Sequence, residues 1–479
     1  MKLSQILPNL QLENPDLKIE SLSFDSRLLQ TGGLYFCLEG SSADGHAYAV
    51  EAAQNGAIAV VAHRVTDAKI PHILVPDTRA ALGIAASRFY NEPAKKLKMI
   101  GITGTNGKTT TTYIVQNILQ AAGKKVGVIG TTAILIGGRR LEAKLTTPDP
   151  IDFHSILATM VEEKIEYVVM EVSAHALALR KMEGVQFDVT AFTNFSRDHL
   201  DFFGDMDTYF AAKKQLFTPV LSKQCVLNAD DEWVRGLIAD CPIPYTTFGC
   251  NNPADVFSVN LSMGPDGLTY VLNLKDDLAE VKFNMPGKFN MYNTLCAAAI
   301  SGALNIPLKS VVKGIRNVKK VDGRFQIINT SKCSIVVDFA HTDDGLTNIL
   351  NTIREFAPKK IITVFGCGGD RDRTKRPVMG RIVSEMSDYC FITSDNPRRE
   401  NPDSIINDIA SGVSKQRQSF MQLVRDRREA IAKAVEFAGD GDVVLVAGKG
   451  AENYIEVGSD KIPYNDEEYI MSLIERQKL

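Results

Sequence analysis

Short apolar runs alternate with polar, helix-like segments along most of the chain. Near the start, the runs are AIAVVAH at 57–63 and PHILVP at 71–76. Further on they are KKVGVIGTT at 124–132, IEYVVMEVS at 165–173 and FDVTAFTNF at 187–195. Apolar runs of strand length, separated by helical segments, are typical of βα units and of a mainly parallel sheet. The pattern therefore predicts an α/β protein.

The last third of the chain repeats a strand followed by a polar loop four times. The repeats are CSIVVDFAH at 333–341, KKIITVFGCGG at 359–369, DYCFITSDNP at 388–397 and GDVVLVAGKG at 441–450. Open α/β sheets bind ligands at the carboxyl ends of their strands, and these four ends carry charged residues or clustered glycines. We expect a doubly wound, Rossmann-like sheet that forms part of a site.

Two joints divide the chain into three expected domains. Its 479 residues exceed what one hydrophobic core organises. A proline- and lysine-containing segment at 91–98 and the segment VDGRFQII at 321–328 mark the joints. We predict an N-terminal α/β domain at 1–97, a central mainly parallel domain with a phosphate-binding loop at 98–326, and a Rossmann-like domain at 327–479.

Composition narrows the class of protein further. Apolar residues make up 44% and charged residues 23% of the chain, as in soluble globular proteins, and a net charge of -3 gives no general attraction to nucleic acid. The first residues lack a signal pattern, and no stretch approaches the ~20 apolar residues that span a bilayer. Eight cysteines without CxxC spacing suggest reduced thiols. We expect a cytoplasmic protein that acts on small molecules, without membrane insertion.

The segment GTNGKTT at 104–110 follows an apolar strand and precedes a helical segment, as a phosphate-binding loop does. Glycines let backbone N–H groups approach an anion, Lys108 supplies a point charge, and Thr109 offers a hydroxyl to Mg²⁺. Gly101 stands one position too far away for the common G-x-x-x-x-G-K-[ST] spacing. The alternative, a turn with a solvated lysine, does not explain why all these features coincide. The expected phosphate-binding residues are Gly104, Thr105, Asn106, Gly107, Lys108, Thr109 and Thr110.

Two further strand ends carry candidate metal ligands. Glu171 lies in MEVSAHAL and His199 in TNFSRDHLDFFG. Mg²⁺ usually takes one or two protein ligands and fills its remaining positions with water and substrate oxygens. Taken alone, a histidine at a strand end more often has a hydrogen-bonded structural role, whereas Glu171 fits either role equally well.

Seven segments, in order and over nearly the whole chain, resemble the Mur ligase family: TGTNGKTT, MEVSAHAL, TNFSRDHLDFFG, AAKKQLF, MPGKFNMYN, VDFAHTDDGL and FGCGGDRDRTKRP. DSR, CLEGSSADGH, LTTPDP and SDNPRRENP resemble the members that add the third amino acid. The resemblance implies an ATP-dependent ligase of peptidoglycan precursor synthesis. It would add meso-diaminopimelate to the D-glutamate carboxylate of UDP-N-acetylmuramoyl-L-alanyl-D-glutamate through an acyl phosphate. We expect a monomer.

The resemblance also implies the catalytic and nucleotide-binding residues. Lys108, Glu171, His199 and a carbamylated Lys213 would be catalytic, and Mg²⁺ would be bound by Thr109, Glu171, His199 and the CO2-derived carbamate on Lys213. Without its charge removed, a lysine beside magnesium would be repelled. A solvated Lys213–Lys214 pair is the alternative. Beyond the loop, ATP would contact Asn293, Arg324, Asp338 and His341.

Two more sets of residues are implied for the other substrates. The UDP-linked substrate would be bound by Ser26, Asp44, Gly45, His46, Thr146, Thr147, Ser173 and Lys181. Turn chemistry alone also explains the N-terminal part of this set. The amino acid would be bound by Arg371, Asp395, Asn396, Pro397, Arg398, Gly448 and Glu452. Pro397 makes a stiff corner, and the Arg398 fork suits the second carboxylate of meso-diaminopimelate, which lysine lacks. A turn with a solvated arginine is the alternative.

The sequence departs from the family pattern at several positions. Ala174 replaces a serine, Ala451 replaces a histidine, and Phe339 replaces a common tyrosine. The expected arginine after His175 corresponds to Arg180 or Lys181, because the register is ambiguous.

Two other functions fit part of the pattern. A folylpolyglutamate synthetase would share the loop and the fold but lack SDNPRRENP, DSR and DGH. A non-catalytic nucleotide switch would bind nucleotide without consuming it in an amino-acid-dependent way.

Overall fold

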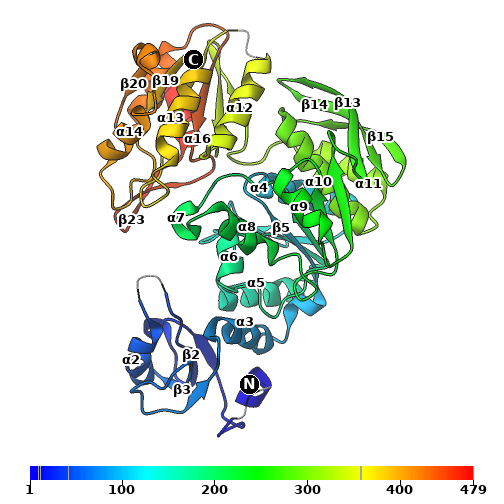
Figure 1. Ribbon diagram of the computed structural model, residues 1–479, viewed down its shortest axis with the longest axis vertical. Coiled ribbons are helices and arrows are strands. Elements are labelled where there is room, and N and C mark those ends of the chain that lie inside the picture. The colour runs from blue at the N-terminus through cyan, green and yellow to red at the C-terminus, as the bar shows by residue number, and fades with distance from the viewer. Residues whose placement is uncertain (9, 11, 41–42, 357–358, 478–479) are drawn as a thin grey trace.

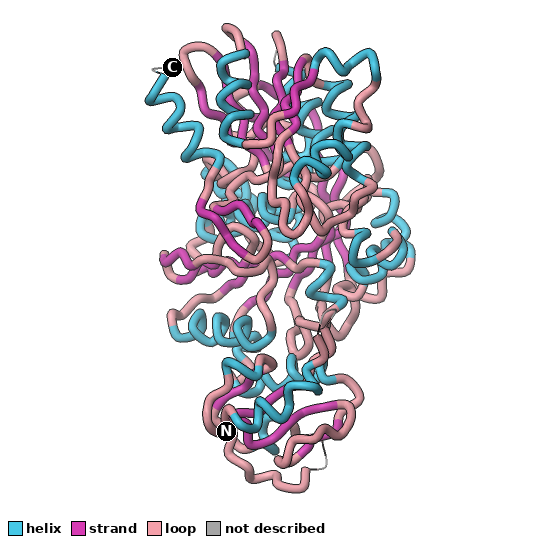
Figure 2. The backbone as a smooth tube through the Cα atoms, turned by 90° about the vertical axis from the view of Figure 1, so that its left-hand side faces the viewer, coloured by secondary structure: helices cyan, strands magenta, loops and turns pink. Residues whose placement is uncertain are grey.

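The computed structural model describes residues 1–8, 10, 12–40, 43–356 and 359–477. Three bodies follow one another along the long axis of the molecule, with the N-terminal body at one end and the C-terminal body at the other (Figure 1). The view turned by 90° shows the same order (Figure 2). Since each body has its own sheet, the sequence-based expectation of a three-domain α/β protein is confirmed.

The N-terminal body is a four-stranded parallel sheet in the order β1-β2-β3-β4. Its strands are β1 (Ser21–Ser23), β2 (Gly33–Phe36), β3 (Ala57–Ala62) and β4 (His72–Leu74), and its helices are α1 (Leu3–Ile6), η1 (Ser26–Leu28), η2 (Gly45–Tyr48), α2 (Ala49–Gln54), α3 (Thr78–Phe89) and η3 (Pro93–Lys96). Asp77 caps α3 by accepting hydrogen bonds from the backbone N–H groups of Arg79 and Ala80. Helix α3 then packs against α5 of the central body.

The central body is built on an eleven-stranded sheet in the order β15-β14-β13-β12-β11-β10-β5-β9-β6-β7-β8. Its strands are β5 (Lys98–Thr103), β6 (Val126–Ile129), β7 (Ile134–Ile136), β8 (Arg139–Leu141), β9 (Tyr167–Glu171), β10 (Val189–Phe192), β11 (Cys225–Asn228), β12 (Tyr245–Gly249), β13 (Val256–Gly264), β14 (Gly267–Leu274) and β15 (Asp277–Phe283). Pairing is parallel from β13 to β6 and antiparallel at both edges. The antiparallel edge strands were not expected from the sequence.

Helices cover both faces of this sheet. They are α4 (Lys108–Ala121), α5 (Pro150–Glu162), α6 (Ala174–Ala178), α7 (Leu200–Phe203), α8 (Met206–Lys214), α9 (Glu232–Ala239), α10 (Lys288–Ala303) and α11 (Leu308–Asn317). Buried side chains of α4, α10 and α11 form one core, and those of α5 and α8 belong to a second core. Helix α4 is packed into the first core together with α10 and α11, and this packing fixes the position of α4 and of the loop that precedes it.

The C-terminal body contains a six-stranded sheet in the order β16-β17-β21-β18-β19-β20, parallel except for β16. Its strands are β16 (Gln326–Asn329), β17 (Cys333–Asp338), β18 (Ile361–Phe365), β19 (Tyr389–Ile392), β20 (Met421–Leu423) and β21 (Asp442–Ala447), with a separate hairpin of β22 (Tyr454–Val457) and β23 (Asp460–Pro463). The helices are α12 (Asp343–Phe356), α13 (Lys375–Met386), α14 (Pro402–Ala410), η4 (Lys415–Phe420), α15 (Arg427–Phe437) and α16 (Asp466–Gln477). The four strands expected from the sequence are present, and the hairpin is an addition.

The exact domain boundaries stay predictions. β5 begins at Lys98, where the central domain is expected to start, whereas β16 begins at Gln326 and pairs with the C-terminal sheet. The eight cysteines, all of them described, are free thiols. Within the described residues, no helix is both long and apolar enough to cross a bilayer.

Close packing of α11 on α4 gives a test of the fold. A Cβ atom added to Gly314 would lie 2.2 Å from the Ile118 Cα and 2.6 Å from its N atom. We predict that Gly314→Ala lowers the free energy of unfolding by about 1–3 kcal/mol, because the two helix backbones must separate. The melting temperature, measured by calorimetry, should fall by about 2–4 °C per kcal/mol.

The matched control is Gly236→Ala in α9, where an added Cβ meets no atom within 4 Å. This exposed helical position should gain about 0.5–1 kcal/mol from the better helix former. Equal effects of the two substitutions would contradict the packing argument.

Candidate active site

The phosphate-binding loop joins β5 to α4, as the sequence predicts. Gly104 and Gly107 have positive φ angles of 145° and 85°, which favour glycine. A Cβ on Gly104 would lie 1.9 Å from Thr193 Oγ1, and one on Gly107 would lie 2.3 Å from Asn293 Oδ1. Both glycines are therefore required by conformation and by space. Gly101, in contrast, lies within β5 against the Phe187 ring, so the unusual spacing does not alter the loop.

Two residues that follow β10, Thr193 and Asn194, form hydrogen bonds with the backbone of this loop. The Asn194 side chain accepts a hydrogen bond from the Asn106 N–H at 2.9 Å and donates one to the Asn106 carbonyl at 3.0 Å. The Thr193 hydroxyl donates to the same carbonyl at 2.6 Å, and the Asn194 carbonyl accepts from the Thr105 N–H. These bonds preorganise the loop before any phosphate binds.

Two lysines converge on one carbonyl oxygen of the loop. Lys108 Nζ donates to the carbonyls of Gly104 at 2.9 Å and Thr105 at 2.8 Å, and Lys213 Nζ donates to Gly104 at 2.8 Å. Burial lowers the pKa of Lys108, while the carboxylates of Glu171 and Asp198 oppose this shift. The two lysine side chains therefore converge where the loop would receive an anion.

Lys213 is the buried member of the expected lysine pair. Lys213 is 1% exposed, and its Nζ lies 4.8 Å from the centre of the Tyr209 ring, whereas Lys214 is exposed. Burial, and to a smaller extent the charge of Lys108, moves the pKa of Lys213 well below its ordinary value. The alternative of two solvated lysines therefore does not hold for Lys213.

Thr109 and Glu171 lie in direct contact. The Thr109 hydroxyl donates to Glu171 Oε2 at 3.0 Å and accepts a bond from Arg324 Nη2 at 3.1 Å. Glu171, which is buried, also accepts bonds from the backbone N–H and the hydroxyl of Thr131. A hydroxyl and a carboxylate oxygen in contact beside the loop are suitable ligands for a divalent cation.

His199 has an unusual backbone conformation, with a φ angle of 55° at the start of α7. Its Nε2 atom lies 3.2 Å from Asp198 Oδ2, and its ring packs edge-on against His175. Burial lowers the pKa of His199 to about 3, although the Asp198 carboxylate opposes the shift. A neutral imidazole at this position keeps a lone pair for a metal ion.

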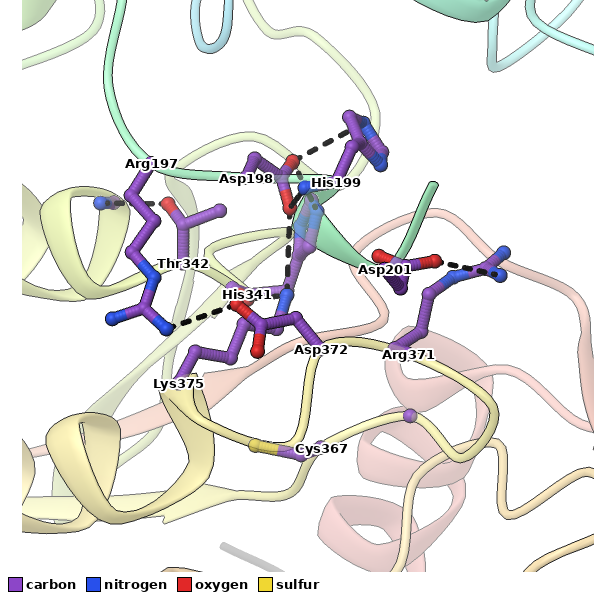
Figure 3. Close-up of polar contacts among 12 residues, drawn as sticks. Arg197, Asp198, His199, Asp201, His341, Thr342, Cys367, Arg371, Asp372 and Lys375 are labelled. Carbon is purple, nitrogen blue, oxygen red and sulfur yellow. Dashed lines mark hydrogen bonds and ion pairs between the residues drawn. The ribbon is translucent and has the colours of Figure 1, made fainter. Parts of the chain in front are cut away.

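The segment around His199 also contacts the C-terminal body (Figure 3). Asp198 lies 3.5 Å from Lys375 Nζ and 3.8 Å from His341 Nε2, and Arg197 pairs with Asp372 at 3.0 Å. Burial raises the pKa of Asp198, but the nearby His341 side chain and the other charges around it outweigh this effect and move the pKa well below its ordinary value. Asp198 therefore carries a negative charge at the interface of the two bodies.

The loop itself reaches the C-terminal body through Asn106. Its side-chain amide donates to Asp344 Oδ2 at 2.9 Å, and Ser196 lies 3.5 Å from the same oxygen. Arg371 of the C-terminal body lies 3.9 Å from Asp201 (Figure 3). The loop residue Asn106 and the nearby residues Ser196 and Asp201 therefore all contact the C-terminal body.

The remaining expected nucleotide residues surround the loop and the joint. Asn293 faces Gly107, and both carboxylate oxygens of Asp338 accept backbone N–H bonds, from Phe325 and Ala340. Phe339 stacks on Arg324, with 4.3 Å between the guanidinium carbon and the ring centre. Phe339, which stands in place of the common tyrosine, therefore packs against an expected nucleotide-binding residue.

The expected binding residues for the UDP-linked substrate form two groups. In the N-terminal body, the Asp44 carboxylate caps η2 and lies 2.7 Å from His46 Nδ1, while Ser26 is buried in η1. Turn and cap geometry explains these contacts without a ligand, so direct binding stays a prediction. Gly45 donates its N–H to the Leu38 carbonyl.

The second group extends from Glu171. Thr147 donates to the Glu171 carbonyl at 2.9 Å and accepts from the Ser173 N–H at 3.0 Å. Thr146 lies 3.1 Å from the Thr131 hydroxyl, which itself binds Glu171. The group is therefore continuous with the candidate metal ligands.

Arg180 and Lys181 point to different partners. Arg180 pairs with Asp77 at 2.7 Å and with Glu183 at 2.6 Å. Lys181 pairs with Asp149 at 2.8 Å and lines a crevice between the N-terminal and central bodies, together with Phe24 and Arg79. Lys181 is thus the better placed of the two to meet an extended substrate.

The expected amino-acid residues meet at the carboxyl ends of β19 and β21. Asn396 donates to Glu452 Oε2 at 2.9 Å and accepts a bond from Lys449 Nζ at 2.9 Å, while Lys449 also pairs with Glu452 at 2.8 Å. A Cβ on Gly448 would lie 2.8 Å from Asp395 Oδ2, so the two strand ends are in contact. Pro397 leads into Arg398, whose φ angle is 50°.

Arg398 is held by protein groups on two sides. Its Nε donates to Glu456 Oε2 at 2.8 Å, and its Nη1 donates to the Gly369 carbonyl at 2.7 Å. The Arg398 side chain is 19% exposed, so a freely solvated arginine is not what the structure shows. Arg371 is more exposed and faces the central body.

Several residues of this region were not singled out from the sequence: Asn194, Arg197, Asp198, Asp344, Lys375 and Glu456. All but Glu456 lie in quoted segments, TNFSRDHLDFFG, VDFAHTDDGL and FGCGGDRDRTKRP, whose density of polar residues after a strand was the available signal. Lys375 is the last basic residue but one of the third segment, and only the packed structure places it on Asp198.

Comparisons with known proteins agree with this architecture. The Mur ligase family catalytic domain matches residues 18–90, the Mur ligase middle domain 102–301, and the Mur ligase glutamate ligase domain 323–450. The UDP-N-acetylmuramoyl-L-alanyl-D-glutamate--2,6-diaminopimelate ligase of Syntrophomonas wolfei is 40% identical over 99% of each chain, and that of Bacillus licheniformis is 41% identical over 98% of each.

A solved structure of a ligase with the same name has a TM-score of 0.71 and 29% identity, and the match covers 100% of this chain and 99% of that one. The three domains and the phosphate-binding loop define the protein as an ATP-dependent ligase. The chain belongs to the Mur ligase family.

Lys108 provides a direct test of the site. We predict that Lys108→Ala lowers ligase turnover by about 10²–10³-fold, because the charge is needed where phosphate charge moves during transfer. The matched control is Lys125→Ala, which removes an exposed lysine beyond the other end of α4. Both variants should keep the wild-type melting temperature. Turnover of Lys108→Ala within a few fold of wild type would contradict the assignment.

Proposed function

We propose that the enzyme adds meso-diaminopimelate to the D-glutamate carboxylate of UDP-N-acetylmuramoyl-L-alanyl-D-glutamate, in peptidoglycan precursor synthesis. The observation that carries the proposal is that polar groups on both sides of the joint of two domains contact one another. The phosphate loop contacts the C-terminal domain through Asn106 and Asp344, and Arg371 of that domain lies 3.9 Å from Asp201. The Thr109–Glu171 pair belongs to the central domain and the Asn396–Glu452 pair to the C-terminal domain. The names of relatives about 40% identical over nearly the full chain support the substrates.

The chemistry explains why these groups share one site. A carboxylate oxygen of the muramoyl dipeptide attacks the γ-phosphorus of ATP, ADP leaves, and an acyl phosphate forms. The free amine of the amino acid then attacks the acyl carbon, phosphate leaves, and the nitrogen loses a proton to form the amide. Little covalent chemistry is left to the protein, so its residues act by positioning and charge stabilisation.

Lys108 and the loop N–H groups would bind the transferred phosphate, and Arg324 would add charge next to Thr109. Thr146, Thr147 and Ser173 would place the dipeptide beside Glu171. The contacts of Asp198 and Asn106 with the C-terminal domain would hold the two domains together and exclude water from the acyl phosphate.

The donor set also fits Mg²⁺. The Thr109 hydroxyl and the Glu171 carboxylate are oxygen ligands in contact, and the low pKa of His199 keeps its imidazole neutral. When bound, Mg²⁺ would neutralise phosphate charge during transfer. We propose Thr109, Glu171, His199 and Lys213, as its carbamate, as the residues that hold it.

Carbamylation of Lys213 is supported by its environment. A neutral amine is the form that reacts with CO2, and burial lowers the pKa of Lys213 accordingly. The carbamate keeps one N–H, which can retain the bond to the Gly104 carbonyl seen at 2.8 Å. The reaction would place a negatively charged carboxylate, able to support a metal ion, on the buried nitrogen.

We predict that Lys213→Ala lowers turnover at least about 10²-fold, because the carboxylate that supports charge neutralisation is lost. Formate should restore part of the activity by placing a carboxylate in the vacated space. The control is Lys214→Ala, an exposed neighbour on the same helix, which should keep wild-type turnover and show no formate effect. Full activity of Lys213→Ala without any added anion would rule out the carbamate.

The amino-acid pocket supports meso-diaminopimelate as the acceptor. We propose that Glu452 and the Gly448 carbonyl receive its distal ammonium, that Arg398 and Asn396 receive its distal carboxylate, and that Arg371 binds the carboxylate near the reacting amine. Asp395 and Pro397 would fix this corner, since Asp395 Oδ1 accepts the Asn396 N–H at 2.7 Å. Lysine lacks the distal carboxylate and so would not make the hydrogen bonds that this group makes with Arg398 and Asn396.

We predict meso-diaminopimelate as the preferred acceptor, with L-lysine about ten- to over a hundredfold poorer in kcat/KM. The test is the mass of the product after incubation with ATP, Mg²⁺, the UDP-muramoyl dipeptide and a panel of amino acids. Arg398→Ala should lose activity with meso-diaminopimelate far more than it changes the KM for ATP. Comparable turnover of lysine and meso-diaminopimelate would reject the acceptor while leaving the ligase intact.

The same assay separates the alternative functions. A folylpolyglutamate synthetase would extend a folate substrate instead of the UDP-muramoyl dipeptide, and a nucleotide switch would show no amino-acid-dependent ATP consumption. We further propose that the enzyme acts as a monomer, since the proposed residues of all three substrate sites come from one chain. We also propose that it acts in the cytoplasm.

A further inference from the structure

Glu456 makes three contacts with the corner formed by Asn396 and Arg398. Its backbone N–H donates to Asn396 Oδ1 at 2.9 Å, its carbonyl accepts from the Arg398 N–H at 3.0 Å, and its carboxylate accepts from Arg398 Nε at 2.8 Å. Glu456 lies on β22 of the hairpin at the end of the C-terminal domain that faces the central domain (Figure 1). No residue of this hairpin was expected at the site.

The backbone contact fixes the orientation of Asn396. Its Oδ1 accepts two hydrogen bonds, from Lys449 Nζ and from the Glu456 N–H, so its Nδ2 must point to Glu452. Any residue at position 456 can supply the backbone N–H. The carboxylate of Glu456 therefore has a separate role, which its side chain alone performs.

The Glu456 carboxylate pairs with Arg398, the arginine proposed to bind the distal carboxylate of the amino acid. Nε of Arg398 is taken by Glu456 and Nη1 by the Gly369 carbonyl, and a Cβ on Gly368 would lie 2.9 Å from Nη1. The guanidinium is thus confined between Gly368, Gly369 and Glu456, with its charge already neutralised by the protein. The pair is partly buried, at 19% exposure for Arg398 and 28% for Glu456.

We propose that Glu456 is a specificity-determining residue, an internal carboxylate that competes with the distal carboxylate of the amino acid for Arg398. The inference rests on the proposed function. An incoming dicarboxylic amino acid must share or displace the Glu456 partner, which weakens its binding. An acceptor with only an ammonium leaves the Arg398–Glu456 pair intact, so the penalty for lysine is smaller than an unpaired arginine would impose.

The test replaces Glu456 by glutamine, which keeps the backbone contacts and an oxygen acceptor but removes the charge. For Glu456→Gln we expect the KM for meso-diaminopimelate to fall about three- to tenfold, with kcat and the KM for ATP unchanged. L-2-aminopimelate, which has the distal carboxylate without the ammonium, should gain by a similar factor. Lysine should become poorer, so the preference for meso-diaminopimelate over lysine rises.

The matched control is Glu429→Gln, which removes an exposed carboxylate of α15 whose partner is Lys433. It should change none of these constants. Glu456→Ala, measured alongside with the melting temperatures, should shift the preference in the same direction as Glu456→Gln.

Two outcomes would overturn the role of Glu456. An unchanged or raised KM for meso-diaminopimelate in Glu456→Gln would show that the carboxylate supports Arg398 instead of competing for it. A fall in kcat at saturating meso-diaminopimelate would show that Glu456 helps to position the acceptor for the reaction and does not act on specificity alone. If the wild-type enzyme itself forms no product with meso-diaminopimelate, the proposed function fails, and the inference fails with it.

Discussion

The Gly104 carbonyl oxygen, to which two lysines donate, is the point on which the active site depends. Lys108 and Lys213 come from different helices and bring their side-chain nitrogens to one acceptor in a largely buried space. Burial, and to a smaller extent the charge of Lys108, disfavours a positive charge on Lys213, so the pKa of Lys213 lies well below its ordinary value. On Lys108, the carboxylates of Glu171 and Asp198 oppose the lowering of the pKa by burial. The two lysines can therefore share one acceptor because they differ in how strongly a positive charge is disfavoured.

The segment after β10 connects the phosphate loop to the C-terminal domain. Thr193 and Asn194 hold the phosphate loop, and a few residues later Arg197 and Asp198 pair with Asp372 and Lys375 of the C-terminal domain. This short segment therefore contacts both the loop and the C-terminal domain.

The sequence predicted the parts of the fold that leave a local pattern. Buried parallel strands such as β9 and β10 are continuous apolar runs, and the loop at 104–110 has a glycine–lysine–threonine signature. The edge strands β13–β15 were missed because their two-sided environment gives alternating, more polar sequences that carry no motif. Asp198 and Glu456 were missed for a different reason: their importance lies in contacts with residues far away in the chain, Lys375 and Arg398.

In the described structure, the groups that are proposed to bind substrates form hydrogen bonds with other groups of the protein. Lys108 and Lys213 donate to the loop carbonyl, Thr109 donates to Glu171, Asn396 to Glu452, and Arg398 to Glu456. A ligand that enters must exchange these internal partners for its own atoms, so each hydrogen bond contributes only the difference between the two. Selectivity then depends on which internal partner a substrate can replace. At the loop the partner of Lys108 is a neutral carbonyl, and an anionic ligand would be a stronger partner for it. At Arg398 the internal partner is itself a carboxylate. Under the proposed assignment, exchange of that partner for a second carboxylate on the amino acid would be nearly even, and residue 456 would set how much this carboxylate adds to binding.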